Sequence, residues 1–160
     1  DHLSDLDRAI RESLHEQGVK PIKSSCQRRN INGKTDKYDL GTCAMIHDGG
    51  KKYVLVALTH FDENDKANMT RAELNQVLGK LMAFLDKKAE AQEVHMPILG
   101  TGLARLNRTP NRILNFTIDV LDFIHTSQII GGLYIDILSL ESANIDLNKI
   151  ENQFVNNIKE

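Results

Sequence analysis

The sequence contains little cysteine, no tryptophan and no long hydrophobic run. Its two cysteines, Cys26 and Cys43, are too few for a disulfide framework, and their spacing is not that of a metal site. No segment has the length and apolarity of a transmembrane helix, and no secretory signal pattern is present. The sequence has 20 Lys and Arg and 22 Asp and Glu residues, so its net charge is -2. This charge gives no general reason to expect nucleic acid or an anionic membrane as a binding partner. We therefore expect one globular domain over residues 1–160, in a reducing cytosol.

The most informative segment is residues 95–105 (HMPILGTGLAR). It predicts a buried strand that ends in a turn bracketed by Gly100 and Gly102, with Arg105 at its far side, followed by a helix that begins at Thr109-Pro110. Glycines let the main chain approach an anion closely, and a helix N-terminus and an arginine both favour phosphate. The alternative is a glycine turn that only connects strand and helix.

Helical and strand periodicities alternate along the chain. Helices are expected from a Ser4/Asp7 capping box to Gly18, from a Thr70/Glu73 capping box to about residue 85, over 110–126, and at the C-terminus. Strands are expected over 40–46, 53–59, 94–99 and 133–138, the first two joined by a hairpin turn at 48–50. This order predicts an α/β class with three layers around a mixed central sheet.

Two local expectations concern the region after this hairpin turn. Residues 53–58 (YVLVAL) are almost all apolar, which predicts a central strand that is covered on both faces. Residues 60–68 are polar and acidic, which predicts a loop; its run Asp62-Glu63-Asn64-Asp65 matches no EF-hand spacing, so we expect solvated carboxylates and no metal. The basic segment 20–39 has only Tyr38 as an aromatic, which favours a solvated face over a nucleic-acid site.

Three blocks of the sequence resemble the macro domain of Thoeris-type bacterial anti-phage effectors. They are residues 38–44 (YDLGTCA), 58–67 (LTHFDENDKA) and 96–105 (MPILGTGLAR), in the order and spacing of that family, and the resemblance covers roughly residues 1–140. It implies a macro-domain-like α/β/α fold and an ADP-ribose-type ligand. The third block matches the phosphate loop of macro domains in general, whereas the second is more particular to this subfamily.

The resemblance also implies a site and a biological setting. The phosphate loop, which would wrap the diphosphate, consists of Gly100, Thr101, Gly102, Leu103, Ala104 and Arg105. The expected ligand neighbours are Gly41, Thr42, Thr59, His60 and Phe61. The ligand would be histidine-ADP-ribose made by a partner TIR-domain protein, and activation would involve homo-oligomerisation. Such effectors carry transmembrane helices upstream, which would place this domain on the cytoplasmic side of the inner membrane.

One departure from the family limits the site. Macro domains normally open with strands that include a Gly-Asp-Ile-type segment for the adenine and an Asn-bearing loop for the distal ribose, and neither is found here. We therefore expect that the N-terminal part of the fold is absent from this chain and is supplied by another segment or chain.

No arrangement of nucleophile, base and acid is recognisable in the sequence. The preferred interpretation is therefore a sensor that binds its nucleotide without a catalytic residue, cofactor or metal. The alternatives are an ADP-ribosyl hydrolase, as many macro domains are, and, less favoured, a nucleic-acid-binding module that uses the basic segment.

Overall fold

The computed structural model describes residues 2–22, 37–62, 64, 66–102, 106–124 and 129–150. The elements are, in chain order, α1 (His2–Glu16), β1 (Cys43–Asp48), β2 (Lys51–Val56), β3 (His60–Phe61), β4 (Ala67–Asn68), α2 (Arg71–Lys88), β5 (Val94–Met96), α3 (Pro110–Phe123) and β6 (Leu133–Ile135). Within these residues, no helix combines the length and the apolarity that crossing a bilayer requires.

The strands form three pairs. β1 and β2 make an antiparallel hairpin in which Asp48 pairs with Lys51, so that Gly49 and Gly50 form a two-residue turn. Both glycines have positive φ, 54° and 77°, as a turn that follows the right-handed twist of the strands requires. β3 pairs with β4 antiparallel, and β5 pairs with β6 in parallel. The predicted hairpin is confirmed, and its strands are shifted by a few residues.

Two helices, α2 and α3, cover one face of the strands and form the core with them. α2 begins with the predicted capping box, because the Thr70 hydroxyl accepts from the Glu73 N–H and the Glu73 carboxylate accepts from the Thr70 N–H. α3 begins at Pro110 as predicted, although Thr109 makes no side-chain cap. Burying the apolar faces of α2 and α3 against the strands is the main stabilising term of such a layer. The buried core residues of this cluster are Cys43, Met69, Leu74, Leu78, Leu81, Met82, Leu85, Met96, Leu106, Ile113 and Val120.

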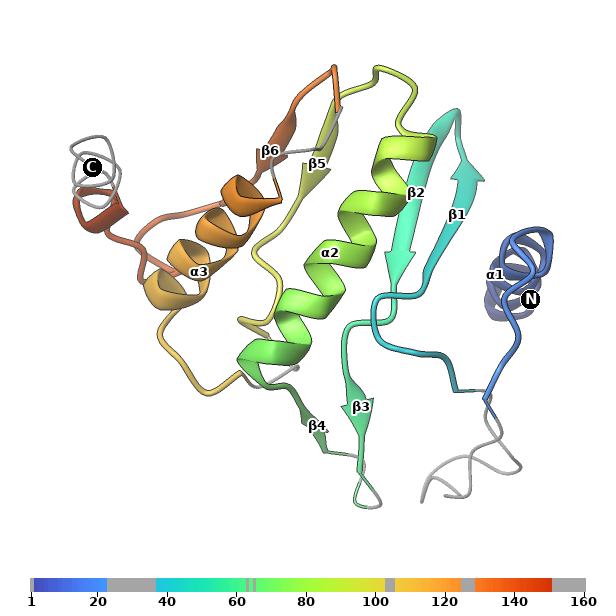
Figure 1. Cartoon of the computed structure of the whole chain (residues 1–160), viewed down its shortest axis with the longest axis horizontal. Helices are drawn as coiled ribbons and strands as arrows, with labels where there is room; N and C mark the ends of the chain where they lie inside the picture. Colours follow the sequence, from blue (N-terminus) through green and yellow to red (C-terminus); the bar gives the residue numbers. More distant parts are fainter. Residues whose placement is uncertain are drawn as a thin grey trace.

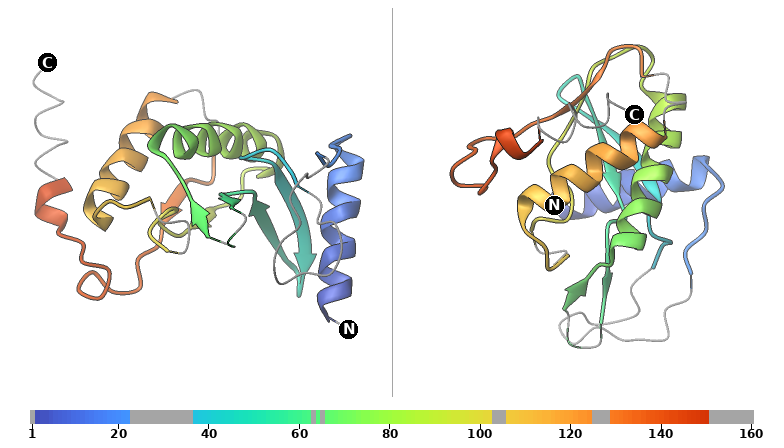
Figure 2. Two further views of the ribbon diagram at one scale, coloured as in Figure 1. Left: turned by 90° about the horizontal axis from the view of Figure 1, so that it is seen from below. Right: turned by 60° about the vertical axis from the view of Figure 1, so that its left-hand side comes forward.

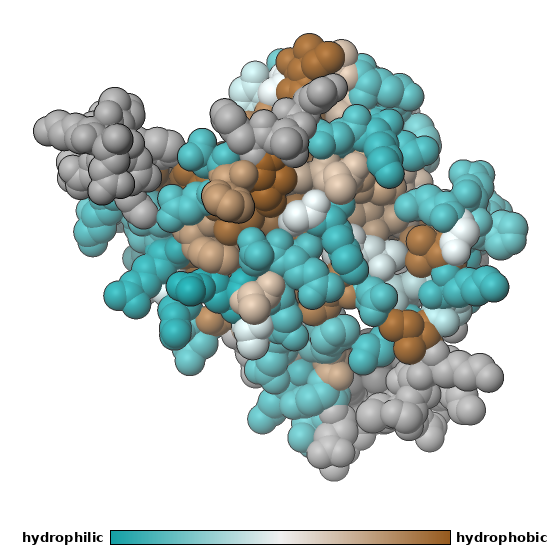
Figure 3. Space-filling view, in the orientation of Figure 1, coloured by the Kyte–Doolittle hydropathy of each residue, from teal (hydrophilic) through white to brown (hydrophobic). Residues whose placement is uncertain are grey.

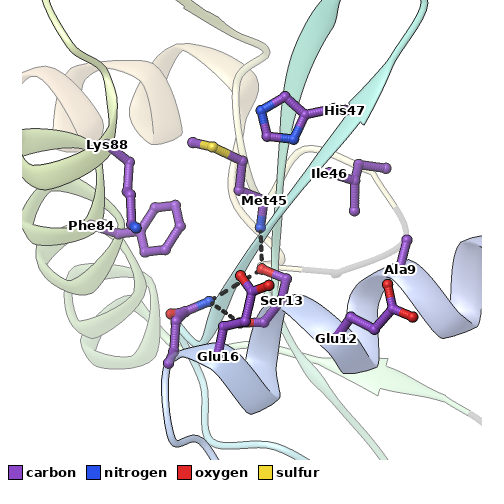
Figure 4. A pocket seen from close by; sticks show the side chains of 10 residues that line it. Ala9, Glu12, Ser13, Glu16, Met45, Ile46, His47, Phe84 and Lys88 are labelled. Carbon is purple, nitrogen blue, oxygen red and sulfur yellow. Dashed lines mark hydrogen bonds between the residues drawn. The ribbon is translucent and has the colours of Figure 1, made fainter.

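α1 lies along the outer edge of β1 and provides partners for its backbone. The Ser13 hydroxyl accepts a hydrogen bond from the Met45 N–H at 2.9 Å (Figure 4). The Gln17 amide donates to the Cys43 carbonyl at 3.0 Å. An uncovered strand edge exposes a row of backbone donors and acceptors, which these side chains occupy here. A pocket of about 440 Å³ lies beside this contact and is lined by α1, β1 and the last turns of α2, including Phe84 and Lys88 (Figure 4).

The strand directions decide where a ligand site can form. β2 and β5 both run toward the lower end of the view in Figure 1, where α2 and α3 begin. The segments that follow β2 and β5 therefore meet at this end, which in α/β sheets is the usual place for ligands. Figure 2 shows α2 and α3 on one side of the strands and α1 beside β1.

Three local predictions are wrong. β2 is not covered on both faces, because Tyr53 is 44% exposed and Leu55 38% exposed. Residues 60–68 are not only a loop, since they contain β3 and β4. The Ser4/Asp7 capping box does not start the first helix, because α1 already begins at His2; its predicted end at Gly18, with φ of 71°, is confirmed.

The described C-terminal segment contacts α3 through the hydrogen bonds of one polar side chain and through a small apolar cluster. The Asn111 amide donates to the Asp146 carbonyl at 3.0 Å and accepts from the Asp146 N–H at 2.7 Å. Ile145 and Ile150 pack with Leu114 in a second, smaller buried cluster. Residues 147–150 are helical, and the remainder of the predicted C-terminal helix lies outside the described residues.

Candidate functional site

The glycine turn follows β5 directly, as the sequence predicts. Gly100 is buried and has a φ of 92°, which only glycine adopts easily, and a Cβ atom built on it would lie within 3.8 Å of Leu106 and Met69. The Thr101 hydroxyl donates to the Ile98 carbonyl at 3.2 Å and so fixes the turn. None of the described residues accepts a hydrogen bond from the backbone N–H of Gly100, Thr101 or Gly102. The N–H groups of the exposed residues Thr101 and Gly102 are therefore available to an anion at the turn.

Gly102 differs from Gly100 in what the fold demands of it. Its φ is not positive, and a Cβ atom built on it meets no atom of the described residues within 4 Å. Neither conformation nor packing therefore requires glycine at this exposed position. A glycine without a side-chain neighbour leaves the backbone open to close approach by a ligand.

The structure brings the block after β2 next to the glycine turn. The Thr59 hydroxyl donates to the Asn68 carbonyl at 2.7 Å, and the adjacent Met69 lies under Gly100, with its sulfur 3.8 Å from a Cβ built there. His60 is half-buried and Phe61 is 49% exposed, both in β3. Thr59, His60 and Phe61 thus lie at the same end of the strands as the glycine turn, as Figure 1 shows.

Gly41 and Thr42 are hydrogen-bonded to Ala57, the residue that follows β2. The Gly41 N–H donates to the Ala57 carbonyl at 2.8 Å, and the Ala57 N–H donates to the Thr42 carbonyl at 2.9 Å. Gly41 has a φ of 81°, and a Cβ atom there would come within 2.7 Å of the Lys80 side chain. The close approach of α2 therefore explains the glycine at position 41 without a ligand.

The buried thiol near Gly41 is not suited to nucleophilic chemistry. The Cys43 S–H donates to the Gly41 carbonyl at 3.3 Å, and burial raises the pKa of this thiol to about 11, against a smaller opposing effect of Lys80. The thiolate is the reactive form of cysteine, so Cys43 behaves as a small core residue.

Asp62 organises its own loop. One of its carboxylate oxygens accepts from the backbone N–H groups of Asn64 and Lys66, at 2.9 and 2.8 Å. Glu63 and Asp65 lie outside the described residues. Across the described part of the chain, no group of three or more His, Cys, Asp or Glu side chains is arranged to hold a metal ion.

His95 belongs to a cluster on the strand face opposite the core. Its ring stacks on Tyr134 with centroids 4.9 Å apart, and its nitrogens lie 3.0 Å from Asp136 and 3.3 Å from Glu93. Hydrogen bonds to Glu93 and Asp136 raise the pKa of the exposed imidazole. The sequence does not indicate this cluster, because Tyr134 in β6 and Asp136, directly after β6, lie about 40 residues further along the chain.

Part of the predicted phosphate loop is not described. Leu103, Ala104 and Arg105 lie outside the described residues, as do Cys26 and most of the basic segment 20–39. Of the predicted neighbours, Thr59, His60 and Phe61 lie at the same end of the strands as Gly100, Thr101 and Gly102, and Gly41 and Thr42 lie one strand away. Their contact with a ligand stays a prediction.

The fold and this site define an α/β domain with a glycine turn at the carboxyl end of its strands. The family model "Thoeris protein ThsA, Macro domain" matches residues 1–130, and the chain therefore belongs to this macro-domain family. It is also similar to the Thoeris protein ThsA of Bacillus amyloliquefaciens (strain Y2), with 25% identity over 103 residues. That match covers 64% of this chain and 32% of the relative, so the chain spans about a third of that protein's length.

Proposed function

We propose that this domain is the nucleotide sensor of a Thoeris defence system and that it binds an ADP-ribose derivative without converting it. The observation that carries the proposal is the turn at Gly100–Gly102, whose backbone N–H groups have no acceptor among the described residues, in a chain of the ThsA macro-domain family. The diphosphate of the ligand would lie on these donors, where a charge-assisted hydrogen bond is about twice as strong as a neutral one. Arg105 would add a bidentate contact.

The proposed ligand is histidine-ADP-ribose, supplied by a partner TIR-domain protein. Binding would favour an assembled form of the protein, which requires that the assembled form has the higher affinity for the ligand. An upstream transmembrane segment would hold the assembly at the cytoplasmic side of the inner membrane.

We also infer that the three strand pairs are parts of one mixed sheet in a three-layer fold. The register of the hairpin directs the backbone groups of Lys52, Val54 and Val56 away from β1, and no described strand pairs with them. Val54 and Val56 nevertheless pack on the core. An additional strand on this edge of β2 would satisfy these groups, and the segment that provides it would carry the adenine and ribose contacts.

The first experiment is a calorimetric titration of the intact domain, including the segment that pairs with β2, with ADP-ribose and with histidine-ADP-ribose, followed by mass analysis of the recovered ligand. A sensor binds the histidine conjugate more tightly than ADP-ribose and returns it intact. Recovery of free histidine and ADP-ribose would instead establish the hydrolase. Absence of heat with either compound would contradict the proposal.

Gly102→Val tests whether the turn holds the ligand. The fold leaves space for a side chain at this position, so folding should be unaffected, whereas the added bulk should hinder close approach of the diphosphate. We expect the affinity to fall at least tenfold, which corresponds to about 1.4 kcal/mol. Gly79→Ala, on a helix remote from the turn, is the matched control and should bind as the unmodified chain does.

A further inference from the structure

A second concave site lies between the first turns of α2 and α3. It has a volume of about 670 Å³, which is within the usual range for small-molecule sites. Met69, Leu106 and Phe116 form its apolar wall. A Cβ atom built at Gly100 would lie 3.7 Å from the Leu106 side chain and 3.8 Å from the Met69 sulfur, so this pocket adjoins the glycine turn.

The charged residues of this pocket are three arginines and one carboxylate. Arg71, Arg108 and Arg112 line it together with Asp119. The Arg71 guanidinium lies over the Phe116 ring at 5.5 Å, and Arg108 donates to the carbonyl of its neighbour Asn107 at 3.1 Å. No ion pair found among the described residues involves any of the three arginines.

The position of these arginines is electrostatically unfavourable for the protein alone. Arg71 is the first residue of α2 and Arg112 the third of α3, where the positive end of a helix dipole repels cations. The first turn of α3 contains no acidic residue, and the Glu73 carboxylate of α2 is engaged in its cap. Three exposed guanidinium groups and one carboxylate line this pocket, so its formal charge is positive and favours an anionic ligand.

We propose that this α2–α3 pocket binds a small phosphate-bearing anion at a site separate from the glycine turn. Arginine forks suit the oxygens of phosphate, and the Phe116 ring with Arg71 above it offers a flat surface for a planar group attached to that phosphate. The lower part of the helix face, where both helices begin, is mostly hydrophilic in Figure 3. A polar, concave and positively charged surface fits a small anion better than an apolar partner.

The test uses inorganic pyrophosphate as probe and the Gly102→Val chain as background, so that the glycine turn is blocked. We expect pyrophosphate to bind this chain and the additional pair Arg108→Gln and Arg112→Gln to weaken binding at least tenfold. The control pair Arg8→Gln and Arg11→Gln makes the same change in net charge on exposed arginines of α1 and should change the affinity less than twofold. Screening over about 8–10 Å at ordinary ionic strength keeps distant charges from contributing.

Amide chemical shifts give an independent readout. Pyrophosphate should shift the signals of Arg112 and Phe116 in the Gly102→Val chain, and the arginine pair should abolish these shifts. The proposal is overturned if the Gly102→Val chain does not bind pyrophosphate, or if the control pair weakens binding as much as the pocket pair does. Failure of the sensor proposal appears elsewhere, as absence of ADP-ribose and histidine-ADP-ribose binding to the intact domain.

Discussion

The two glycine turns of this chain look alike in sequence but differ in what requires their glycines. At Gly49 and Gly50, both φ angles are positive, so the hairpin itself requires glycine. At the turn after β5, Gly100 has a positive φ and is buried, whereas Gly102 has neither a positive φ nor a neighbour among the described residues within 4 Å of a built Cβ. The hairpin turn is therefore fully explained by the fold.

The difference separates structural glycines from candidate binding glycines. A glycine that is required by φ or by packing gives no information about a ligand, which applies to Gly41 under Lys80 as well. A glycine that the fold would allow to be another residue invites a functional explanation, and Gly102 is such a case beside open backbone donors. Substitution of a structural glycine should thus lower stability, whereas substitution of Gly102 should lower binding with little effect on stability.

The largest loss of stability is expected for Gly131→Ala. A Cβ atom at this position would lie 2.3 Å from the backbone carbon of Gln92 and 2.5 Å from the Glu93 nitrogen, so the chain before β5 would have to move. Overpacking against backbone costs about 3 kcal/mol at the upper end of its usual range. Urea unfolding measures this loss, and an unchanged unfolding midpoint would show that glycine is not required by packing here.

Local patterns predicted the elements whose signals are local. The capping box of Thr70 and Glu73 and the turn at Gly49–Gly50 depend on residues within four positions of each other, and both are present. The prediction that residues 53–58 are covered on both faces was wrong, because an apolar run does not show whether another element covers its second face. The short strands β3 and β4 have two residues each and therefore show no periodicity.

The candidate sites were predictable only in part for the same reason. The glycine turn is contiguous in sequence, and its strand and helix flanks could be predicted from their own residues. The contact of Thr59 with Asn68, and of Met69 with Gly100, depends on the packing of β3, β4 and α2. The α2–α3 pocket combines Arg71 with Arg108 and Arg112, which lie far from it in the sequence. The unusual feature in the sequence itself is Arg112, a cation in the first turn of a helix.

A smaller loss of stability is expected for Gly50→Ala. The position is open, so the cost comes only from the φ of 77°, which disfavours a side chain by about 1–2 kcal/mol. Gly50→Asn should lose less, because Asn tolerates this conformation better than Ala. Equal stability of the Ala variant and the unmodified chain would mean that the turn adopts another conformation and that the comparison of the two turns does not hold.

The smallest effect is a gain of stability from Gly79→Ala, compared with Gly102→Ala. Gly79 lies inside α2 with no atom within 4 Å of a built Cβ, so alanine should stabilise the helix by about 0.5–1 kcal/mol. At Gly102 the fold likewise leaves space, but the residue is not in a helix, and stability should change by less than about 0.5 kcal/mol. Binding of ADP-ribose should then distinguish these two glycines, because only the turn variant places its methyl group beside the open backbone donors. If both alanine variants bind ADP-ribose as the unmodified chain does, the methyl group at position 102 does not meet the ligand, and the valine variant becomes the decisive measurement of whether the turn is a site at all.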